Sequence, residues 1–197
     1  MTTVQTQAGD TRNETSNETR IVPARMAHLV LQCARRADTV AWYMKLFQAH
    51  LVFEDNVLTF ITYDDEHHRL AFFNMPDIPP KQRETAGVHH IAYSYNDIGD
   101  LLATYVRLKP LGILPFWCIN HGPTTSLYYR DPEGNDIELQ ADNGNDPGAY
   151  FHSEAFAQNN LGVEFDPDEL VRMWKAGASA AELSAVGTAA TGKSTFI

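Results

Sequence analysis

The sequence predicts an α+β fold in which two tandem βαβββ modules form one curved, mixed eight-stranded sheet around a cleft, with the helices outside. An internal repeat is the first observation behind this prediction. Its equivalent positions lie 62 residues apart: His28 and His90, Tyr43 and Tyr105, Leu46 and Leu108. The second observation is the order of segments, since each copy has one strand-like, one helical and three further strand-like stretches. Each copy has only about 55 to 60 residues, too few to cover its own sheet, so we expect the copies to pair.

The composition fits a soluble globular protein with one domain of ordinary size. Of its 197 residues, 44% are apolar and 11% aromatic, as is typical of such proteins. The 25 acidic and 15 basic residues give a net charge of −10 without a basic stripe, which argues against nucleic-acid binding. No apolar run approaches the roughly 18 residues that span a bilayer, and the first residues lack a signal-peptide layout. Cys33 and Cys118 make no disulfide framework, so we expect a cytoplasmic protein with reduced thiols.

The first module is expected over residues 25–82. Its first strand spans residues 26–33, and Asp38 is the expected cap of the helix that follows. The apolar positions of this helix recur with helical spacing: Val40, Tyr43, Met44 and Phe47. Three strands are expected next, at residues 50–54, 58–63 and 67–73. The proline-rich run at residues 75–80 ends the module, because proline cannot donate to a sheet ladder.

The second module repeats this plan over residues 83–142. A strand at residues 87–94 precedes a helix that Asn96 or Asp97 caps and that Pro110 and Gly112 stop. Three strands are expected after it, at residues 114–120, 124–130 and 136–140. Between the last two strands, the sequence Asp-Pro-Glu-Gly suits a tight turn whose glycine takes a positive φ.

Period-two alternation predicts which side chains face the cleft. His28 and His90 fall on the strand faces opposite the bulky apolar residues, which we expect to pack against the helices. In the last strand, Glu138 alternates with Ile137 and Leu139 in the same way. The alternation therefore lets His28, His90 and Glu138 all face the cleft.

Two terminal segments flank the modules. Residues 1–24 are rich in polar residues and are expected to be disordered. Residues 143–197 form an extension that is partly helical, with an Asp166-Pro167 start and a Ser179–Glu182 capping box. It could cover the cleft mouth, pack against another subunit or lie over the outer surface. Residues 187–194 match the P-loop pattern, but such a loop needs a helix after it, so we expect the last ~10 residues to be disordered.

Two imidazoles and one carboxylate are the metal-binding groups that these positions offer. Such a set leaves positions open on a divalent metal and is typical of non-haem Fe(II) oxygenases. Each residue also has an ordinary explanation, since single histidines at strand starts usually lie on the surface or in a satisfied core. Agreement between the repeat and the strand alternation favours the metal site, and alignment with His28 selects His90 over His89.

Residues 119–138 contain a set of polar, apolar and turn residues at fixed spacing: Ile119, His121, Leu127, Tyr128, Asp131, Pro132, Gly134 and Glu138. This set resembles the signature of the type I extradiol catechol dioxygenases, in the vicinal-oxygen-chelate superfamily, and fills every defined position of it. A pattern with this many fixed positions is much more specific than a lone glycine loop. The likeness runs from residue 26 to residue 140 and covers both modules.

The resemblance implies a non-haem Fe(II)-dependent extradiol dioxygenase that opens a catechol-type ring with O2 and yields a semialdehyde or ketoacid. His28, His90 and Glu138 would hold the iron, and Mn(II) would suit the same ligands. The catechol and O2 would be the partners. Larger members carry an additional, metal-free pair of modules, so in this chain the contacts that shape the pocket must come from the extension or from a homo-oligomer.

The resemblance also implies roles for three further side chains. His68 would be the base that takes a proton from the substrate, although strand alternation does not decide between His67 and His68. His121 would support the bound substrate and oxygen without ligating the metal, and Tyr128 would hydrogen-bond near the substrate hydroxyls. A loop histidine and a buried tyrosine with an incidental partner are the ordinary alternatives.

Two other functions are conceivable on the same scaffold. A glyoxalase-like metal-dependent isomerase or thiol transferase commonly has a fourth protein ligand on the fourth strand of the first module. That strand offers no strong ligand: Ala71, Phe72, Phe73 and Asn74. A metal-free small-molecule-binding protein would not need His28, His90 and Glu138 to coincide. The sequence therefore favours the oxygenase.

Overall fold

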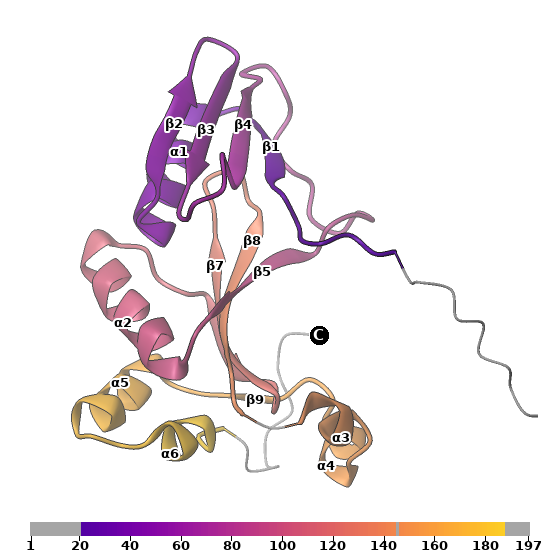
Figure 1. Ribbon diagram of the computed structural model, residues 1–197, viewed down its shortest axis with the longest axis vertical. Helices are drawn as coiled ribbons and strands as arrows, with labels where there is room; N and C mark the ends of the chain where they lie inside the picture. Colours follow the sequence, from indigo (N-terminus) through magenta and orange to yellow (C-terminus); the bar gives the residue numbers. More distant parts are fainter. Residues whose placement is uncertain (1–20, 145, 188–197) are drawn as a thin grey trace, which may run out of the picture.

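The computed structural model describes residues 21–144 and 146–187. Most of the N-terminal tail and the last ten residues, both predicted to be disordered, lie outside the described residues, as does most of the P-loop-like segment. The α+β class is confirmed. Each module forms a mixed sheet with its helix on the outside, and the first module lies above the second in Figure 1.

The first module follows the predicted order of elements. It contains β1 (Leu29–Cys33), α1 (Arg36–Phe47), β2 (His50–Glu54), β3 (Leu58–Thr62) and β4 (Leu70–Asn74). The sheet order is β1-β4-β3-β2, with β1 parallel to β4 and the other pairs antiparallel. The first strand starts three residues later than expected, so His28 lies just ahead of it.

The second module is larger because the extension joins its sheet. It contains β5 (His90–Tyr95), α2 (Ile98–Leu108), the 3-10 helix η1 (Lys109–Leu111), β6 (Trp117–Asn120), β7 (Thr124–Arg130) and β8 (Asp136–Asp142). The sheet order is β5-β8-β7-β6-β9, in which β9 (Val163–Glu164) belongs to the extension. The described strands thus form two sheets of four and five strands, where the sequence predicted one of eight. The reason is that β1 and β5 each pair only within their own module.

The extension lies along the second module. Before β9 it forms α3 (Pro147–Phe151) and α4 (Glu154–Gln158), and after β9 it forms α5 (Pro167–Lys175) and α6 (Ala180–Ser184). Figure 1 shows α5 and α6 beside α2, and Tyr105 of α2 donates a hydrogen bond to Asp168 of α5 at 2.9 Å. Of the three placements left open by the sequence, the structure has the extension on the outer surface of the second module, where it also adds the edge strand β9 to the sheet.

Helix ends follow local chemistry with one exception. Asp97 caps α2 by accepting from the amide of Asp100, and Gly112 ends η1 in the left-handed region at φ 73°. The exception is α1, which begins two residues before the predicted cap. Its N-cap is Arg35, without a side-chain hydrogen bond, and Asp38 lies in the first turn.

None of the described helices has the length and apolar character needed to cross a membrane.

One hydrophobic core joins the two modules. The buried core side chains include Tyr43 and Leu46 of α1 and their repeat equivalents Tyr105 and Leu108 of α2. The modules also meet where the rings of Phe47 and Tyr93 lie 4.5 Å apart. As the alternation predicted, the bulky residues of β1 and β5 pack into this core.

The β7–β8 turn fastens the second module to the first. Asp131 is 4% exposed and accepts hydrogen bonds from the Tyr43 hydroxyl (3.1 Å) and from the amide of Asn135 (2.7 Å). The next carboxylate, Glu133, accepts from the Arg35 amide at 2.6 Å. The predicted turn thus forms, with Gly134 at φ 89°, and it also ties helix α1 to the second sheet.

Replacing Asp131 with alanine should lower the free energy of unfolding by about 2 to 3 kcal/mol, because a buried hydroxyl and the Asn135 amide lose a charged acceptor. Urea unfolding followed by circular dichroism measures this. The matched control is Asp142→Ala at the exposed end of β8, for which a surface substitution should cost no more than about 0.5 kcal/mol. Equal losses for the two variants would contradict the fastening role of the turn.

Candidate functional site

Strand pairing brings His90 and Glu138 together. β5 runs parallel to β8 and places Ala92 opposite Glu138, so His90 and Glu138 lie on the same face of the sheet. The Nε2 atom of His90 lies 3.0 Å from Oε2 of Glu138. Glu138 is 4% exposed, whereas a third of the His90 side chain is open to solvent. A buried carboxylate and a partly exposed imidazole in contact offer two ligands to a divalent cation.

Two signature residues surround the same carboxylate. Tyr128 of β7 pairs with Glu138 from the other side of β8, and its hydroxyl lies 3.1 Å from Nε2 of His121. His121 follows β6, and its Nε2 atom is 4.0 Å from Oε1 of Glu138. Burial, together with the nearby Glu138 charge, raises the pKa of Tyr128 well above its usual value of 10. Tyr128 therefore stays protonated and can donate a hydrogen bond at neutral pH.

His28 and His68 form a second group, in the first module. The His68 ring stacks between His28 and Phe60, with both centroid distances 4.5 Å. Burial, followed by the neighbouring His28 and His67 charges, lowers the pKa of His68 below 6.5. His68 is thus neutral at pH 7 and can accept a proton. His67 is more exposed and contacts Glu66 at 3.6 Å.

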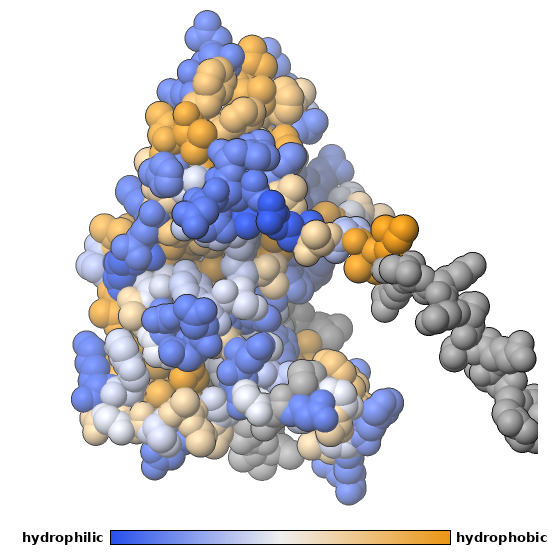
Figure 2. All heavy atoms as spheres, viewed as in Figure 1, coloured by the Kyte–Doolittle hydropathy of each residue, from blue (hydrophilic) through white to orange (hydrophobic). Residues whose placement is uncertain are grey.

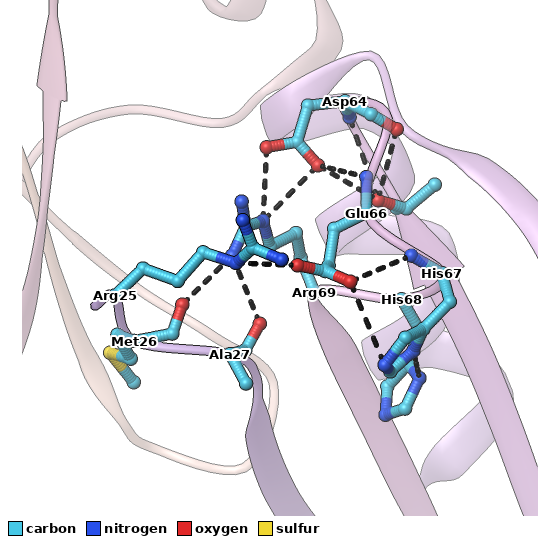
Figure 3. Close-up of polar contacts among 9 residues, drawn as sticks. Arg25, Met26, Ala27, Asp64, Glu66, His67, His68 and Arg69 are labelled. Atoms are coloured by element: carbon cyan, nitrogen blue, oxygen red, sulfur yellow. Dashed lines mark hydrogen bonds and ion pairs between the residues drawn. The ribbon is translucent and has the colours of Figure 1, made fainter. Parts of the chain in front are cut away.

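An arginine fixes the segment ahead of His28. Figure 3 shows the Arg69 guanidinium between Asp64 and the backbone that leads to His28. Its Nη1 atom donates to the carbonyls of Met26 (2.8 Å) and Ala27 (3.0 Å), while Nε donates to Asp64 at 2.9 Å. A side chain with several fixed donors suits this bridging role. The backbone on the N-terminal side of His28 is therefore held to the β3–β4 loop.

The six predicted site residues thus fall into two groups. The structure brings together His90, Glu138, His121 and Tyr128 in the second module, and His28 with His68 in the first. Across residues 21–144 and 146–187 no three His, Cys, Asp or Glu side chains come close enough to hold one metal ion. As they stand, two of the three proposed metal ligands converge and His28 does not join them.

Two cavities lie next to the β7–β8 turn, and their linings contain none of the six predicted site residues. The larger, about 580 Å³, is lined by residues that include Val30 and Gln32 of β1, Phe73 of β4 and Asn135 of the turn. The smaller, about 310 Å³, reaches His89 and Asp136. Both include Lys81 of the segment that links the modules. Space for a small molecule therefore exists between the His28 strand and the hairpin that carries Glu138.

Sequence reasoning missed two contributors to the site. His89 lies with its Nδ1 atom 2.8 Å from Nδ1 of His90 and so can orient that ring. The adjacent His pairs at 67–68 and 89–90 were the signal for it. The other is the backbone carbonyl of Leu161, which accepts a hydrogen bond from Nδ1 of His121. No side-chain pattern could have revealed a carbonyl.

Known proteins resemble the chain in sequence and in structure. The family model of the Glyoxalase/Bleomycin resistance protein/Dioxygenase superfamily matches residues 25–139. Biphenyl-2,3-diol 1,2-dioxygenase 2 of Rhodococcus globerulus is 44% identical over 78% of this chain and 83% of its own length. Biphenyl-2,3-diol 1,2-dioxygenase 3 of the same organism is 40% identical over 83% of this chain and 88% of its own. An integron cassette protein from the mobile metagenome of the Halifax Harbour sewage outfall has a TM-score of 0.50 at 13% identity, covering 60% of this chain and 99% of its own, and supports the fold alone.

The pairing of His90 with Glu138 predicts a graded loss of divalent-metal binding. His89→Ala should weaken Co2+ binding about 10- to 100-fold, as is typical when a residue that only orients a ligand is removed. His90→Ala should weaken it more than that, because it deletes a ligand. Titration calorimetry with Co2+ measures both variants.

The control for this series is His50→Ala, which removes an exposed histidine of β2. It should leave the Co2+ affinity unchanged. A His50 effect as large as that of His90, or full affinity in His90→Ala, would contradict the assignment.

Proposed function

The chain belongs to the Glyoxalase/Bleomycin resistance protein/Dioxygenase superfamily, and from this premise we propose that it is an extradiol dioxygenase that opens the ring of a catechol-type aromatic with O2. One observation carries the proposal: Glu138, His90, His121 and Tyr128, three of them positions of the dioxygenase signature, converge on one face of the second sheet. The relatives that share 40–44% identity with the chain are named as dioxygenases of an aromatic diol. The expected product is a ring-opened semialdehyde or ketoacid.

Extradiol dioxygenases are metal-dependent, and we assign the metal as Fe(II), with Mn(II) suited to the same donors. When bound, such an ion holds a catechol and O2 in adjacent positions and lets charge pass between them. The proposed ligands are His28, His90 and Glu138. His90 and Glu138 are in contact at 3.0 Å, so the proposal requires His28 to approach this pair in the working enzyme.

Three side chains would handle protons and orientation. Tyr128 stays protonated, because burial and the nearby Glu138 charge raise its pKa, and it would donate a hydrogen bond to the diol. His121 presents Nε2 beside Tyr128 and Glu138 and would support bound substrate and oxygen. His68 is neutral at pH 7 because its pKa is lowered, and it would take the proton of the second hydroxyl. Its stacking on His28 supports His68 over His67 for this role.

The substrate proposed is a catechol with an apolar substituent, since the relatives are named for biphenyl-2,3-diol. The larger cavity, about 580 Å³, has Val30, Phe73 and Ile78 in its lining together with polar residues such as Lys81 and Glu133, and an aryl group would contact the apolar part of that wall. O2 would be the co-substrate.

Free Cys33 and Cys118, whose pKa values burial raises to about 12, fit a reducing, cytoplasmic environment.

A homo-oligomer is also proposed. The residues Leu51, Val52 and Phe53 of β2 are 45–48% exposed, and Figure 2 shows apolar atoms gathered on the part of the first module that β2 and β3 occupy in Figure 1. An exposed apolar edge strand usually needs cover. A second copy of the chain would supply it.

The isomerase alternative lacks a supporting observation. By strand register, the β4 residue equivalent to Glu138 is Ala71, since β1 pairs Val30 with Ala71 as β5 pairs Ala92 with Glu138. Alanine cannot ligate a metal, and Ala71 is 2% exposed. A fourth protein ligand at that position is therefore excluded, which leaves coordination positions for the substrates.

The function is tested by O2 uptake after anaerobic loading with Fe(II). With 2,3-dihydroxybiphenyl we expect oxygen consumption in equal amount to substrate and a yellow product, because ring cleavage incorporates both oxygen atoms into a conjugated acid. His28→Ala, His90→Ala and Glu138→Ala should abolish uptake, and His68→Ala should lower kcat about 100- to 10,000-fold, the range for loss of a proton-transfer group. His50→Ala should leave turnover unchanged.

Two results would contradict the dioxygenase assignment. Turnover of a substrate without oxygen would indicate an isomerase or transferase. Catechol binding in the iron-loaded protein with neither oxygen uptake nor product would indicate a small-molecule-binding protein.

A further inference from the structure

A short turn of the C-terminal extension, residues 159–162, contacts the ring of His121. The Leu161 carbonyl lies within hydrogen-bond reach of Nδ1 of His121. A carbonyl oxygen can only accept, so Nδ1 must carry the hydrogen. In the neutral ring Nε2 then carries no hydrogen, and it can accept a hydrogen bond from the Tyr128 hydroxyl, 3.1 Å away. The contact with Leu161 therefore places the hydrogen on Nδ1, and Nε2, the nitrogen that faces Glu138, carries none in the neutral ring.

Asn159 holds this turn in one conformation. Its Oδ1 atom accepts from the amides of Leu161 (3.2 Å) and Gly162 (3.0 Å), and its Nδ2 atom donates to the Gly162 carbonyl at 2.7 Å. An asparagine that bonds the backbone two residues ahead is a usual way to fix a turn. The direction of the Leu161 carbonyl is therefore set within the turn itself.

Gly162 lets the turn approach His121. Its φ is +119°, which side chains rarely allow, and a Cβ atom there would overlap the Asn120 carbonyl oxygen and lie 2.8 Å from Cα of His121. Only glycine fits this approach without moving either strand of chain. A glycine at position 162 is therefore required for the turn to lie this close to the backbone of His121.

The backbone that carries His121 is held by the same extension. β9 pairs with β6, placing Val163 opposite Asn120. The buried Asn120 amide donates to the carbonyls of Ser184 (2.7 Å) and Val186 (2.9 Å). Backbone and ring of His121 are therefore both fixed by residues outside the two modules.

We propose that the 159–162 turn is a positioning element for His121: the Leu161 carbonyl selects the tautomer with hydrogen on Nδ1 and aims the free Nε2 at Tyr128 and Glu138. The catalytic consequence rests on the proposed dioxygenase function, whereas the tautomer does not. A hydrogen bond to one ring nitrogen commonly decides the state of the other. The extension would thus complete the site from the side opposite the first module.

Gly162→Ala tests the proposal, with Gly177→Ala as its matched control. Gly177 also lies in the extension and also has a positive φ, +87°, but a Cβ there meets nothing within 4 Å. Gly162→Ala should lower kcat for 2,3-dihydroxybiphenyl about 10- to 100-fold with little change in KM, because the lost interaction orients a reacting group. Gly177→Ala should keep the kcat of the unchanged chain.

The second readout is the 15N NMR spectrum of the histidines in the full chain with diamagnetic Zn2+, assigned by His121→Gln. The unchanged chain and Gly177→Ala should show His121 with hydrogen on Nδ1, and Gly162→Ala should show a mixture of tautomers. If Gly162→Ala does not fold, Asn159→Asp decides, since it replaces the amide that donates to the Gly162 carbonyl with a carboxylate oxygen that repels it, and it should shift the tautomer in the same direction.

The outcomes separate this proposal from the proposed function. An unchanged His121 spectrum in the folded variant overturns the positioning role, whether or not kcat falls. A shifted spectrum with unchanged kcat in an active dioxygenase overturns its catalytic consequence. A shifted spectrum in a protein that cleaves no catechol supports the positioning of His121 and rejects the dioxygenase function.

Discussion

The buried carboxylate of Glu138, on the inner strand β8 of the second sheet, organises the structure around it. Glu138 is 4% exposed, and a charge removed from water is costly unless partners replace its hydration. The partners come from the strand on either side and from the loop after β6: His90, Tyr128 and His121. A cation would satisfy the same carboxylate, so the requirement for partners in folding and the requirement for ligands in metal binding favour the same residues.

Comparison of the two repeats shows why only the second module has such a buried carboxylate. His28 and His90 are equivalent in sequence, yet His28 stacks on His68 while His90 contacts a carboxylate. The difference arises in the neighbouring strand, which offers Ala71 in the first module where the second has Glu138. The modules are nevertheless tied together by the buried hydrogen bond from Tyr43 to Asp131, at the tip of the hairpin that carries Glu138.

The sequence was sufficient for the features that depend on local pattern. Alternation placed Ile137 and Leu139 in the core and Glu138 opposite them, and the turn at Gly134 formed where its residue types required. Features that depend on long-range pairing were not accessible. The division into two sheets depends on partner choice by β1 and β5, and β9 is a two-residue strand with no periodicity to detect. The arrangement of His28 relative to His90 likewise depends on how whole modules pack, which no spacing of residues encodes.

A crystal structure of the anaerobic Fe(II)-loaded protein, with anomalous scattering at the iron edge, would show whether residues 28, 90 and 138 share one ion. We expect a single iron peak bonded to Nε2 of His90, to the Glu138 carboxylate and to the His28 imidazole, with the remaining positions open to the substrate and O2. An iron peak elsewhere in the chain, or one bonded to His90 and Glu138 while His28 remains stacked on His68, would contradict it.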